Sequence, residues 1–462
     1  MNGRAVLIAA FLAPAPALAA GDVAHRSLVA GYKAAFVCSA HFNAGRTLAE
    51  IEANELARIY PDYRETLADL PAPMIDETAK RVSVSYSEAM APRVAVWRGP
   101  QFGCVQLPAG AAADAPAPAI SAPRAAPSRD AEPWPAGDRT EGPLFADTPE
   151  GAAMAGAIER AFDRASYGAG AETTAVLIVR DGIIIGERYR ADFDMHTPQR
   201  TWSVAKSIAA SVIGAAAQKG LIDVARPAAL GAWSAPGDPR GKITIDNLLR
   251  MASGLDSGPA GNRTDAVYFG GGRVIDHAAG NRLVAGPGTR FVYANNDTML
   301  AMRALRERMS ARAYARFPFE ALLNPLNMRR TTIETDWNND YVLSSQVWTT
   351  ARDLARLGLL YLNDGVWNGK RILPEGWTDY VRAPSGPQPA ARGGYGAQFW
   401  LFGEDQGLPA GTYAAIGNRG QYLVIVPARS VLILRRGYDE VGGVSFDAAR
   451  FAAEILAALP AD

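Results

Sequence analysis

A serine and a lysine three residues apart are of the right types to supply the nucleophile and the base of a hydrolase. Ser203 and Lys206 frame the run Ser-Val-Ala-Lys, and residues three apart on a helix lie on one face, a turn from each other. A neutral lysine amine there can take the serine proton and make the hydroxyl a nucleophile. The pattern is common by chance, and an exposed lysine beside a small buried serine would also explain it.

The use of lysine in this chain makes the pair more informative. Of 47 basic residues only six are lysines: Lys33, Lys80, Lys206, Lys219, Lys242 and Lys370. Arginine keeps its proton in proteins, so it cannot serve as a base. A titratable amine at residue 206 therefore favours a chemical role for the pair.

Two further segments could complete a site. Tyr293 and Asn295 follow a Pro-Gly turn, and residues two apart in an extended segment point the same way. A phenol beside an activated serine can relay protons, and an amide can bind a substrate carbonyl. A core tyrosine and a turn asparagine remain the structural alternative.

The third segment is the run Asn418-Arg419-Gly420-Gln421, which precedes a predicted strand. Glycine lets a substrate approach the backbone closely, so Gly420 could border the site. We expect the N–H of Gln421 to form an oxyanion hole with the N–H of Ser203, and Arg419 to supply a cation. The alternative is a plain glycine-containing turn.

Hydrophobic patterns predict the elements that would position these residues. Segments 175–179 and 183–189 form a hairpin on an Asp-Gly turn, and 422–426 and 431–435 form a second hairpin. A final amphipathic helix is predicted over 445–459. Hairpins at both ends with a helical middle indicate one antiparallel sheet, built from the two ends of the domain and covered by helices on both faces.

Composition divides the chain into four parts. Residues 1–19 read as a signal peptide, 20–107 as a small α+β region, 108–140 as an Ala/Pro-rich linker, and 141–462 as the catalytic domain. The signal peptide is predicted from Arg4, a short apolar run and a small-x-small cleavage site. A periplasmic or secreted protein is therefore expected.

The two cysteines, Cys38 and Cys104, lie in the small α+β region. An even cysteine count in an exported protein predicts a disulfide, and two free buried thiols are the alternative. The four histidines are scattered, so no metal site and no cofactor are expected. A net charge of zero argues against nucleic acid or an anionic membrane as partner, and no membrane span follows the signal. The oligomeric state is left open.

In this order, Ser203-x-x-Lys206, Tyr293-x-Asn295 and a glycine-containing strand resemble the active-site elements of the serine β-lactamase and penicillin-binding protein superfamily. The Tyr-x-Asn form is similar to class C β-lactamases, D-alanyl-D-alanine carboxypeptidases, related esterases and aminohexanoate-oligomer hydrolases. The resemblance covers about residues 144–459, with further similar stretches at 243–255, 344–346 and 352–358. It implies an α/β (α+β) fold in which an antiparallel sheet flanked by helices carries an all-helical subdomain.

The resemblance also implies a function and its limits. It implies a serine hydrolase that cleaves a small-molecule ester or amide through an acyl-enzyme. The β-lactamases and carboxypeptidases carry Lys or His where this run has Asn418, which shifts weight toward an esterase or amide hydrolase. The alternatives are a penicillin-recognising carboxypeptidase or β-lactamase and a non-catalytic cell-wall ligand-binding protein. Glu320, in a run that imitates the class A deacylation motif, is expected to be structural.

Overall fold

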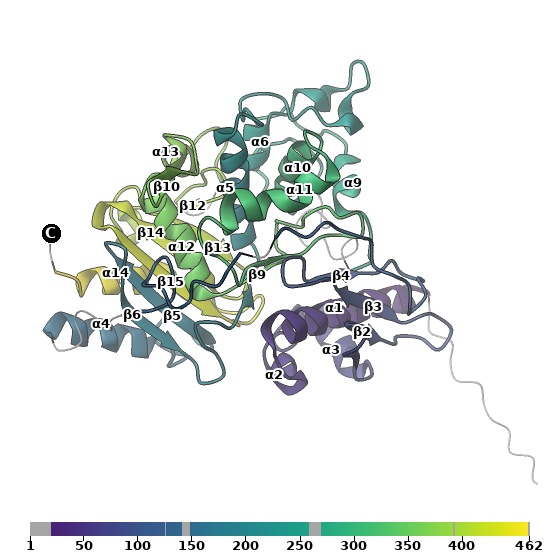
Figure 1. Cartoon of the computed structure of the whole chain (residues 1–462), viewed down its shortest axis with the longest axis horizontal. Coiled ribbons are helices and arrows are strands. Elements are labelled where there is room, and N and C mark those ends of the chain that lie inside the picture. The colour runs from purple at the N-terminus through teal and green to yellow at the C-terminus, as the bar shows by residue number, and fades with distance from the viewer. Residues whose placement is uncertain (1–19, 125, 141–147, 258–268, 391–392, 461–462) are drawn as a thin grey trace, which may run out of the picture.

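The computed structural model of the chain (Figure 1) describes residues 20–124, 126–140, 148–257, 269–390 and 393–460. The predicted signal peptide and the predicted start of the catalytic domain at residue 141 lie outside these residues. Among the helices of the described residues, none combines the length and apolar character needed to cross a membrane.

A six-stranded antiparallel sheet forms the centre of the catalytic domain. Its strand order is β12-β13-β14-β15-β5-β6, so the last strands of the domain pair with the first, as predicted. Leu434 lies opposite Leu177 across that junction. Both predicted hairpins are confirmed. The strands are β5 (Thr173–Arg180), β6 (Ile183–Tyr189), β12 (Trp400–Leu401), β13 (Tyr413–Gly417), β14 (Gln421–Val426) and β15 (Val431–Gly437).

Helices cover both faces of this sheet (Figure 1). Successive strand residues point to opposite faces, so Ile178 and Ile433 belong to one apolar cluster and Leu177 and Leu434 to another. The terminal helices α4 (Pro149–Arg160) and α14 (Ala448–Ala457) cover the first face, and α5 (Val204–Gln218) and α12 (Ala351–Leu362) the second. Thr148 caps α4 with Pro149 at its first position, where proline costs no hydrogen bond.

A largely helical subdomain lies beyond α5, at the top of Figure 1. A small sheet beside it has the strand order β7-β9-β8, and its strand β7 leads into α5. Its members and the remaining short elements are α6 (Ile245–Leu249), α9 (Val274–Ala279), α10 (Asn295–Arg306), α11 (Ala311–Pro318), the π-helical turn Phe319–Leu323, α13 (Trp377–Arg382), β7 (Gln199–Arg200), β8 (Thr332–Ile333), β9 (Val347–Thr349), β10 (Val366–Trp367) and β11 (Lys370–Arg371).

The N-terminal region packs one long helix against a four-stranded sheet. The elements are α1 (Ala20–Ala44), α2 (Leu48–Ala53), α3 (Pro61–Asp69), β1 (Met74–Asp76), β2 (Arg81–Val84), β3 (Arg93–Trp97) and β4 (Cys104–Gln106). Thr47 and Glu50 form a capping box at the start of α2. Cys38 and Cys104 are joined in a disulfide that ties α1 to β4.

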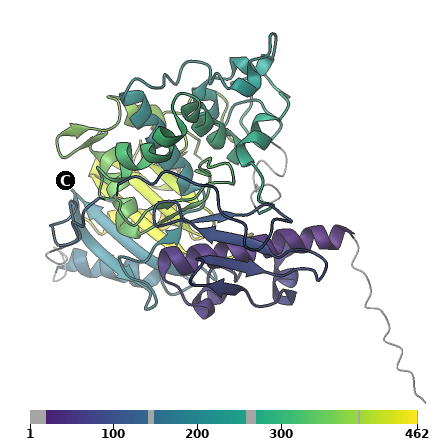
Figure 2. The same ribbon diagram turned by 45° about the vertical axis from the view of Figure 1, so that its right-hand side comes forward.

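This region is not a separate lobe, because the apolar residues of α1 and many others of the region belong to the same core cluster as the catalytic domain. Phe36 of α1 lies 5.8 Å from Trp202, and Tyr32 lies 5.0 Å from Phe269, measured between ring centroids. Glu334 of the catalytic domain accepts hydrogen bonds from Ser39 and from the N–H of Cys104. In Figure 2 the purple N-terminal elements lie directly against the catalytic domain.

The Ala/Pro-rich segment after β4 is anchored to the catalytic domain at several points. The structure assigns it neither helix nor strand in its described residues, apart from one bridge between Pro133 and Arg139. The indole N–H of Trp134 donates to Gly182, and Arg356 donates to the carbonyl oxygen of Gly137. The segment therefore lies along the surface of the domain with fixed contacts near its end.

Candidate active site

The turn before α5 delivers Ser203 to the surface of a pocket. Trp202 has a φ of 50°, a left-handed conformation that is rare for a bulky residue and must be held by its surroundings. The N–H of Thr201 donates to Val347 of β9, and the Trp202 ring packs under the Arg200 guanidinium at 4.0 Å. Ser203 then stands at the start of α5, partly exposed, with the positive end of the helix behind it.

Lys206 lies one turn further along α5 and reaches back to Ser203. Its Nζ is 3.1 Å from the Ser203 Oγ, 2.6 Å from the Asn295 Oδ1 and 2.9 Å from the Ser344 carbonyl oxygen. These three partners are a hydroxyl, an amide and a carbonyl, all neutral. Only 1 % of the lysine surface is exposed, and among the residues that the structure describes no carboxylate accepts a hydrogen bond from the amine.

That setting changes the protonation of Lys206. Burial disfavours the charged ammonium and lowers its pKa to about 7 from a usual value of 10.5. A lysine with such a pKa is neutral in a large fraction of molecules near neutral pH. The arrangement therefore provides a base within hydrogen-bonding distance of the serine proton.

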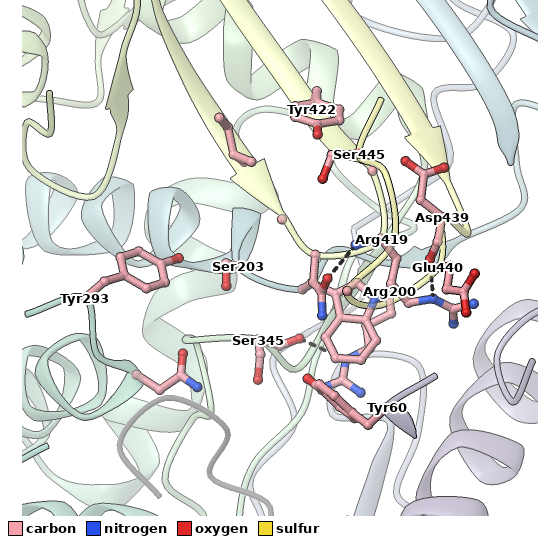
Figure 3. A pocket seen from close by; sticks show the side chains of 18 of the residues that line it. Tyr60, Arg200, Ser203, Tyr293, Ser345, Arg419, Tyr422, Asp439, Glu440 and Ser445 are labelled. Atoms are coloured by element: carbon pink, nitrogen blue, oxygen red, sulfur yellow. Dashed lines mark hydrogen bonds between the residues drawn. The ribbon is translucent and has the colours of Figure 1, made fainter. Parts of the chain in front are cut away.

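Tyr293 and Asn295 come to the same place from the start of α10. Tyr293 precedes the helix, and burial raises the pKa of its phenol to about 12, an increase that the Ser203 side chain partly offsets. The Lys206 Nζ lies 4.9 Å from the centre of the tyrosine ring. The first two predicted segments thus meet around the Ser203 hydroxyl, and Figure 3 shows the Tyr293 side chain pointing at it.

In the third segment, the glycine beside Ser203 is Gly417 and not Gly420, which the sequence suggested. Gly417, at the end of β13, is the glycine that lies against the nucleophile: a Cβ on it would stand 3.2 Å from the Ser203 nitrogen and 2.2 Å from the Thr201 oxygen. Gly420 instead faces the side chains of Arg435 and Asp439. The two glycines stand on either side of one hairpin turn, and the turn places the first beside Ser203.

The side chains of Arg419 and Gln421 both have partners within the fold. The Arg419 guanidinium donates to the carbonyl oxygens of Asn54, Glu55 and Ala57, at 2.9, 3.1 and 2.7 Å, so it holds the N-terminal region and is not a free cation for substrate. The Gln421 side chain donates to Gly437 and accepts from Arg436. In the sheet, Gln421 at the start of β14 pairs with Gly417 at the end of β13.

A cavity of about 390 Å³ opens over Ser203. Tyr293 and Trp400 border it on one side, with Trp400 5.4 Å from the Tyr293 ring. Tyr395 packs behind them and Phe399 lies in the core against Tyr361 and Tyr413. Tyr60 of the N-terminal region lines the same cavity, a contribution that nothing in the local sequence around it indicated.

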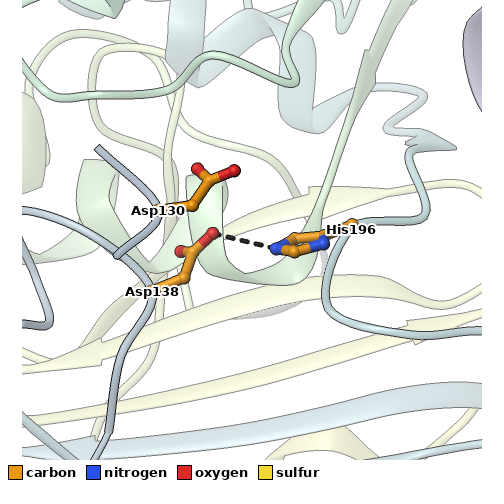
Figure 4. Close-up of side chains that lie close together, drawn as sticks. All are labelled: Asp130, Asp138 and His196. Atoms are coloured by element: carbon orange, nitrogen blue, oxygen red, sulfur yellow. Dashed lines mark hydrogen bonds and ion pairs between the residues drawn. The ribbon is translucent and has the colours of Figure 1, made fainter. Parts of the chain in front are cut away.

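Two other candidate groups lie away from this cavity. Glu320 is half exposed and pairs with Arg316 at 2.8 Å, which fits the expected structural role. Asp130, Asp138 and His196 gather near the end of the Ala/Pro-rich segment (Figure 4). Arg330 donates to both aspartates, at 2.7 and 3.3 Å, so a guanidinium already provides the cation between them.

The chain matches the beta-lactamase family model over residues 158–441. The protein belongs to this family. It is 27 % identical over 290 residues to the 6-aminohexanoate-dimer hydrolase of Paenarthrobacter ureafaciens, a match that spans 57 % of this chain and 72 % of the relative.

Solved structures agree on the fold. A family VIII carboxylesterase superposes with a TM-score of 0.51 at 15 % identity, covering 68 % of this chain and 98 % of the esterase. A penicillin-binding protein homologue from Caulobacter crescentus gives a TM-score of 0.50 at 15 % identity, with 67 % and 98 % covered. The expected fold class and superfamily are confirmed, and the protein is a serine hydrolase of the beta-lactamase-related superfamily.

Proposed function

We propose that the protein hydrolyses a small ester or amide through an acyl-enzyme, with Ser203 as nucleophile and Lys206 as base. The observation that carries this proposal is the buried Lys206 amine, 3.1 Å from the Ser203 Oγ and hydrogen-bonded only to neutral acceptors. Lys206 takes the serine proton as Oγ attacks the substrate carbonyl carbon.

The remaining groups complete the cycle. The carbonyl oxygen becomes negative and accepts hydrogen bonds from the N–H of Ser203 and that of Asn418, the residue after the glycine that touches Ser203. Tyr293 gives its phenolic proton to the leaving oxygen or nitrogen, and the proton held by Lys206 returns to Tyr293. Water then attacks the acyl ester of Ser203 while Lys206 takes one of its protons; the Ser203 Oγ leaves the acyl carbon, regains that proton from Lys206, and the acid is released.

The strand beside the nucleophile bears on the substrate. Enzymes with a Lys-Thr-Gly motif carry a cation two residues before the glycine. Here the residues before Gly417 are Ala415 and Ile416, and Ile416 lines the cavity. The apolar run favours an ester or amide whose recognition does not depend on a carboxylate at that position. Because one relative is named 6-aminohexanoate-dimer hydrolase, the 6-aminohexanoate dimer is the first amide to test.

The test is covalent labelling followed by turnover. A fluorophosphonate should label the wild-type protein on Ser203, and Ser203→Ala should abolish both the label and the hydrolysis of p-nitrophenyl acetate. Ser207→Ala is the matched control, because Ser207 is a buried serine of the same helix whose hydroxyl donates to Gln398. Labelling that survives in Ser203→Ala would contradict the assignment.

The same experiment separates the two alternatives. Stable labelling of Ser203 by a fluorescent penicillin would favour a penicillin-recognising enzyme. Ligand binding with no covalent adduct would favour a binding protein.

We further propose that the protein is exported. The disulfide between Cys38 and Cys104 supports this, since disulfides persist in oxidising compartments. Mass spectrometry of the protein from its native host should find residues 1–19 removed and these two thiols oxidised.

A further inference from the structure

The cavity over Ser203 has walls from two parts of the chain. Tyr293 and Trp400 belong to the catalytic domain, whereas Tyr60 belongs to the N-terminal region, which lies before the residues that match the family model. In Figure 3, Tyr293 and Tyr60 stand on opposite sides of Ser203. The two sides therefore have different origins.

The chemistry of the site determines which part of a substrate meets which wall. A proton donor must lie within hydrogen-bonding distance of the atom that leaves. Tyr293 is the group placed to donate that proton, so the leaving group lies on the Tyr293 and Trp400 side. The acyl group then extends the other way, past Asn418 and toward Tyr60.

Several contacts hold the Tyr60 wall in place. Tyr60 precedes α3, and its ring meets Trp202 at 6.4 Å and Tyr63 at 6.1 Å, both edge-on. The Arg419 guanidinium fixes the chain just before it through the carbonyl oxygens of residues 54, 55 and 57. A wall held from both sides cannot swing aside easily for a long chain.

The loop after β15 closes the same side. The N–H of Val441 donates to the Arg58 carbonyl oxygen at 3.0 Å, and Arg64 of α3 forms an ion pair with Glu440. Glu440 itself lines the cavity. The segment between α2 and α3 therefore braces both Tyr60 and the loop beside it.

We propose that the N-terminal region is a specificity element of the enzyme, in which Tyr60 forms the end wall of the acyl pocket and restricts the substrate to short acyl groups. This inference rests on the proposed acyl-enzyme function. It assigns to residues outside the matched family domain a direct part in substrate selection.

The test compares p-nitrophenyl esters of acetate, butyrate, octanoate and decanoate. In the wild type, kcat/KM should fall at least about tenfold from butyrate to octanoate, because added methylenes meet the wall. Tyr60→Ala should raise the octanoate-to-butyrate ratio of kcat/KM about tenfold. Tyr60→Phe keeps the ring and should keep the wild-type ratio. An unchanged ratio in Tyr60→Ala overturns the proposal.

A binding measurement keeps this outcome separate from the proposed function. In the Ser203→Ala background, alkanoates of increasing length are titrated by the fluorescence of Trp202 and Trp400, both of which line the cavity. Alkanoates longer than butanoate should bind more weakly, and octanoate binding should recover when Tyr60→Ala is added. If octanoate binding does not recover, Tyr60 is not the end wall of the acyl pocket. Absence of all ester turnover would count against the proposed function, while this titration still decides the wall. Tyr60→Leu replaces Tyr60→Ala in both assays if the alanine variant does not fold.

Discussion

Lys206 and Arg356 are both cationic residues of the catalytic domain with 1 % of their surface exposed, and their surroundings are opposite in kind. Lys206 meets only neutral acceptors. Arg356 donates to Asp138 at 2.6 Å and to Asp353 at 3.0 Å. Asp138 belongs to the cluster drawn in Figure 4, near the end of the Ala/Pro-rich segment.

The electrostatic consequences differ accordingly. Burial raises the pKa of Asp138, but Arg356, His196 and Arg352 together outweigh burial and hold that pKa below its usual range. At Lys206 nothing offsets burial, and the pKa falls to about 7. The buried arginine with carboxylate partners fixes structure, whereas the buried lysine without them loses its proton more readily and becomes available as a base.

The largest effect should come from replacing the base by a residue that keeps its proton. Lys206→Arg should lower kcat/KM for p-nitrophenyl acetate by about 1000-fold or more, because general-base assistance is worth about 10²–10⁴-fold. Lys219→Arg, at the exposed end of the same helix, should retain wild-type activity. A Lys206→Arg enzyme within tenfold of wild type would show that this amine is not the base.

Removing a carboxylate partner of the buried Arg356 should affect stability and not catalysis. Asp138→Asn leaves buried arginine charges only partly compensated and should lower the free energy of unfolding by about 3–5 kcal/mol, measured with urea. Activity per folded molecule should stay within about twofold. Asp130→Asn is the control, since Asp130 is a third exposed and should cost less. Equal losses in the free energy of unfolding for both variants would show that the deeper burial of Asp138 does not increase its contribution to stability.

The two sites can be made alike by adding a carboxylate beside the lysine. Asn295→Asp places a negative charge near the Lys206 Nζ, which is 2.6 Å from the present Oδ1. We expect the pKa of Lys206 to rise by about 1–3 units. The pH at which kcat/KM reaches half of its maximum should rise by the same amount. Asn295→Ser removes the amide without adding charge and should leave that midpoint at or below its wild-type position. A midpoint that does not move in Asn295→Asp would mean that Lys206 does not control the rise.

The smallest effect is the pH dependence of the wild type. The active amine is neutral, so activity is lost below its pKa and present above it. kcat/KM should therefore rise about tenfold per pH unit below pH 7 and level off above it, with half of its maximum at about pH 7. The profile is measured between pH 5 and 9 with an ester whose background hydrolysis is subtracted. A midpoint above pH 9 would indicate an ordinary, solvated lysine.

Local signals in the sequence were sufficient for much of the fold. The hairpin on Asp181-Gly182 forms as predicted, and the Thr148 cap and the capping box of α2 are signals of the same local kind. These features depend on turn and cap chemistry within a few residues. Helix α1 was not predicted because residues 29–40 are buried almost all round, which removes the alternation of polar and apolar faces on which such predictions rely.

The site shows the same division. Ser203, Lys206, Tyr293 and Asn295 meet around one hydroxyl as the motif spacing suggested. The third segment was placed on Gly420 because two glycines flank one turn and the sequence does not say which side faces Ser203. Tyr60 could not be found at all, since its place depends on packing between segments far apart in the chain.

The contacts of Arg419 have a consequence for how the protein folds. This residue lies on the turn between β13 and β14 and donates to carbonyl oxygens more than 360 positions earlier in the chain. Contacts of such sequence separation form late, after the entropy of closing a long loop has been overcome. The pocket is therefore complete only when the two ends of the polypeptide have met, and a partly synthesised chain carries an unfinished site.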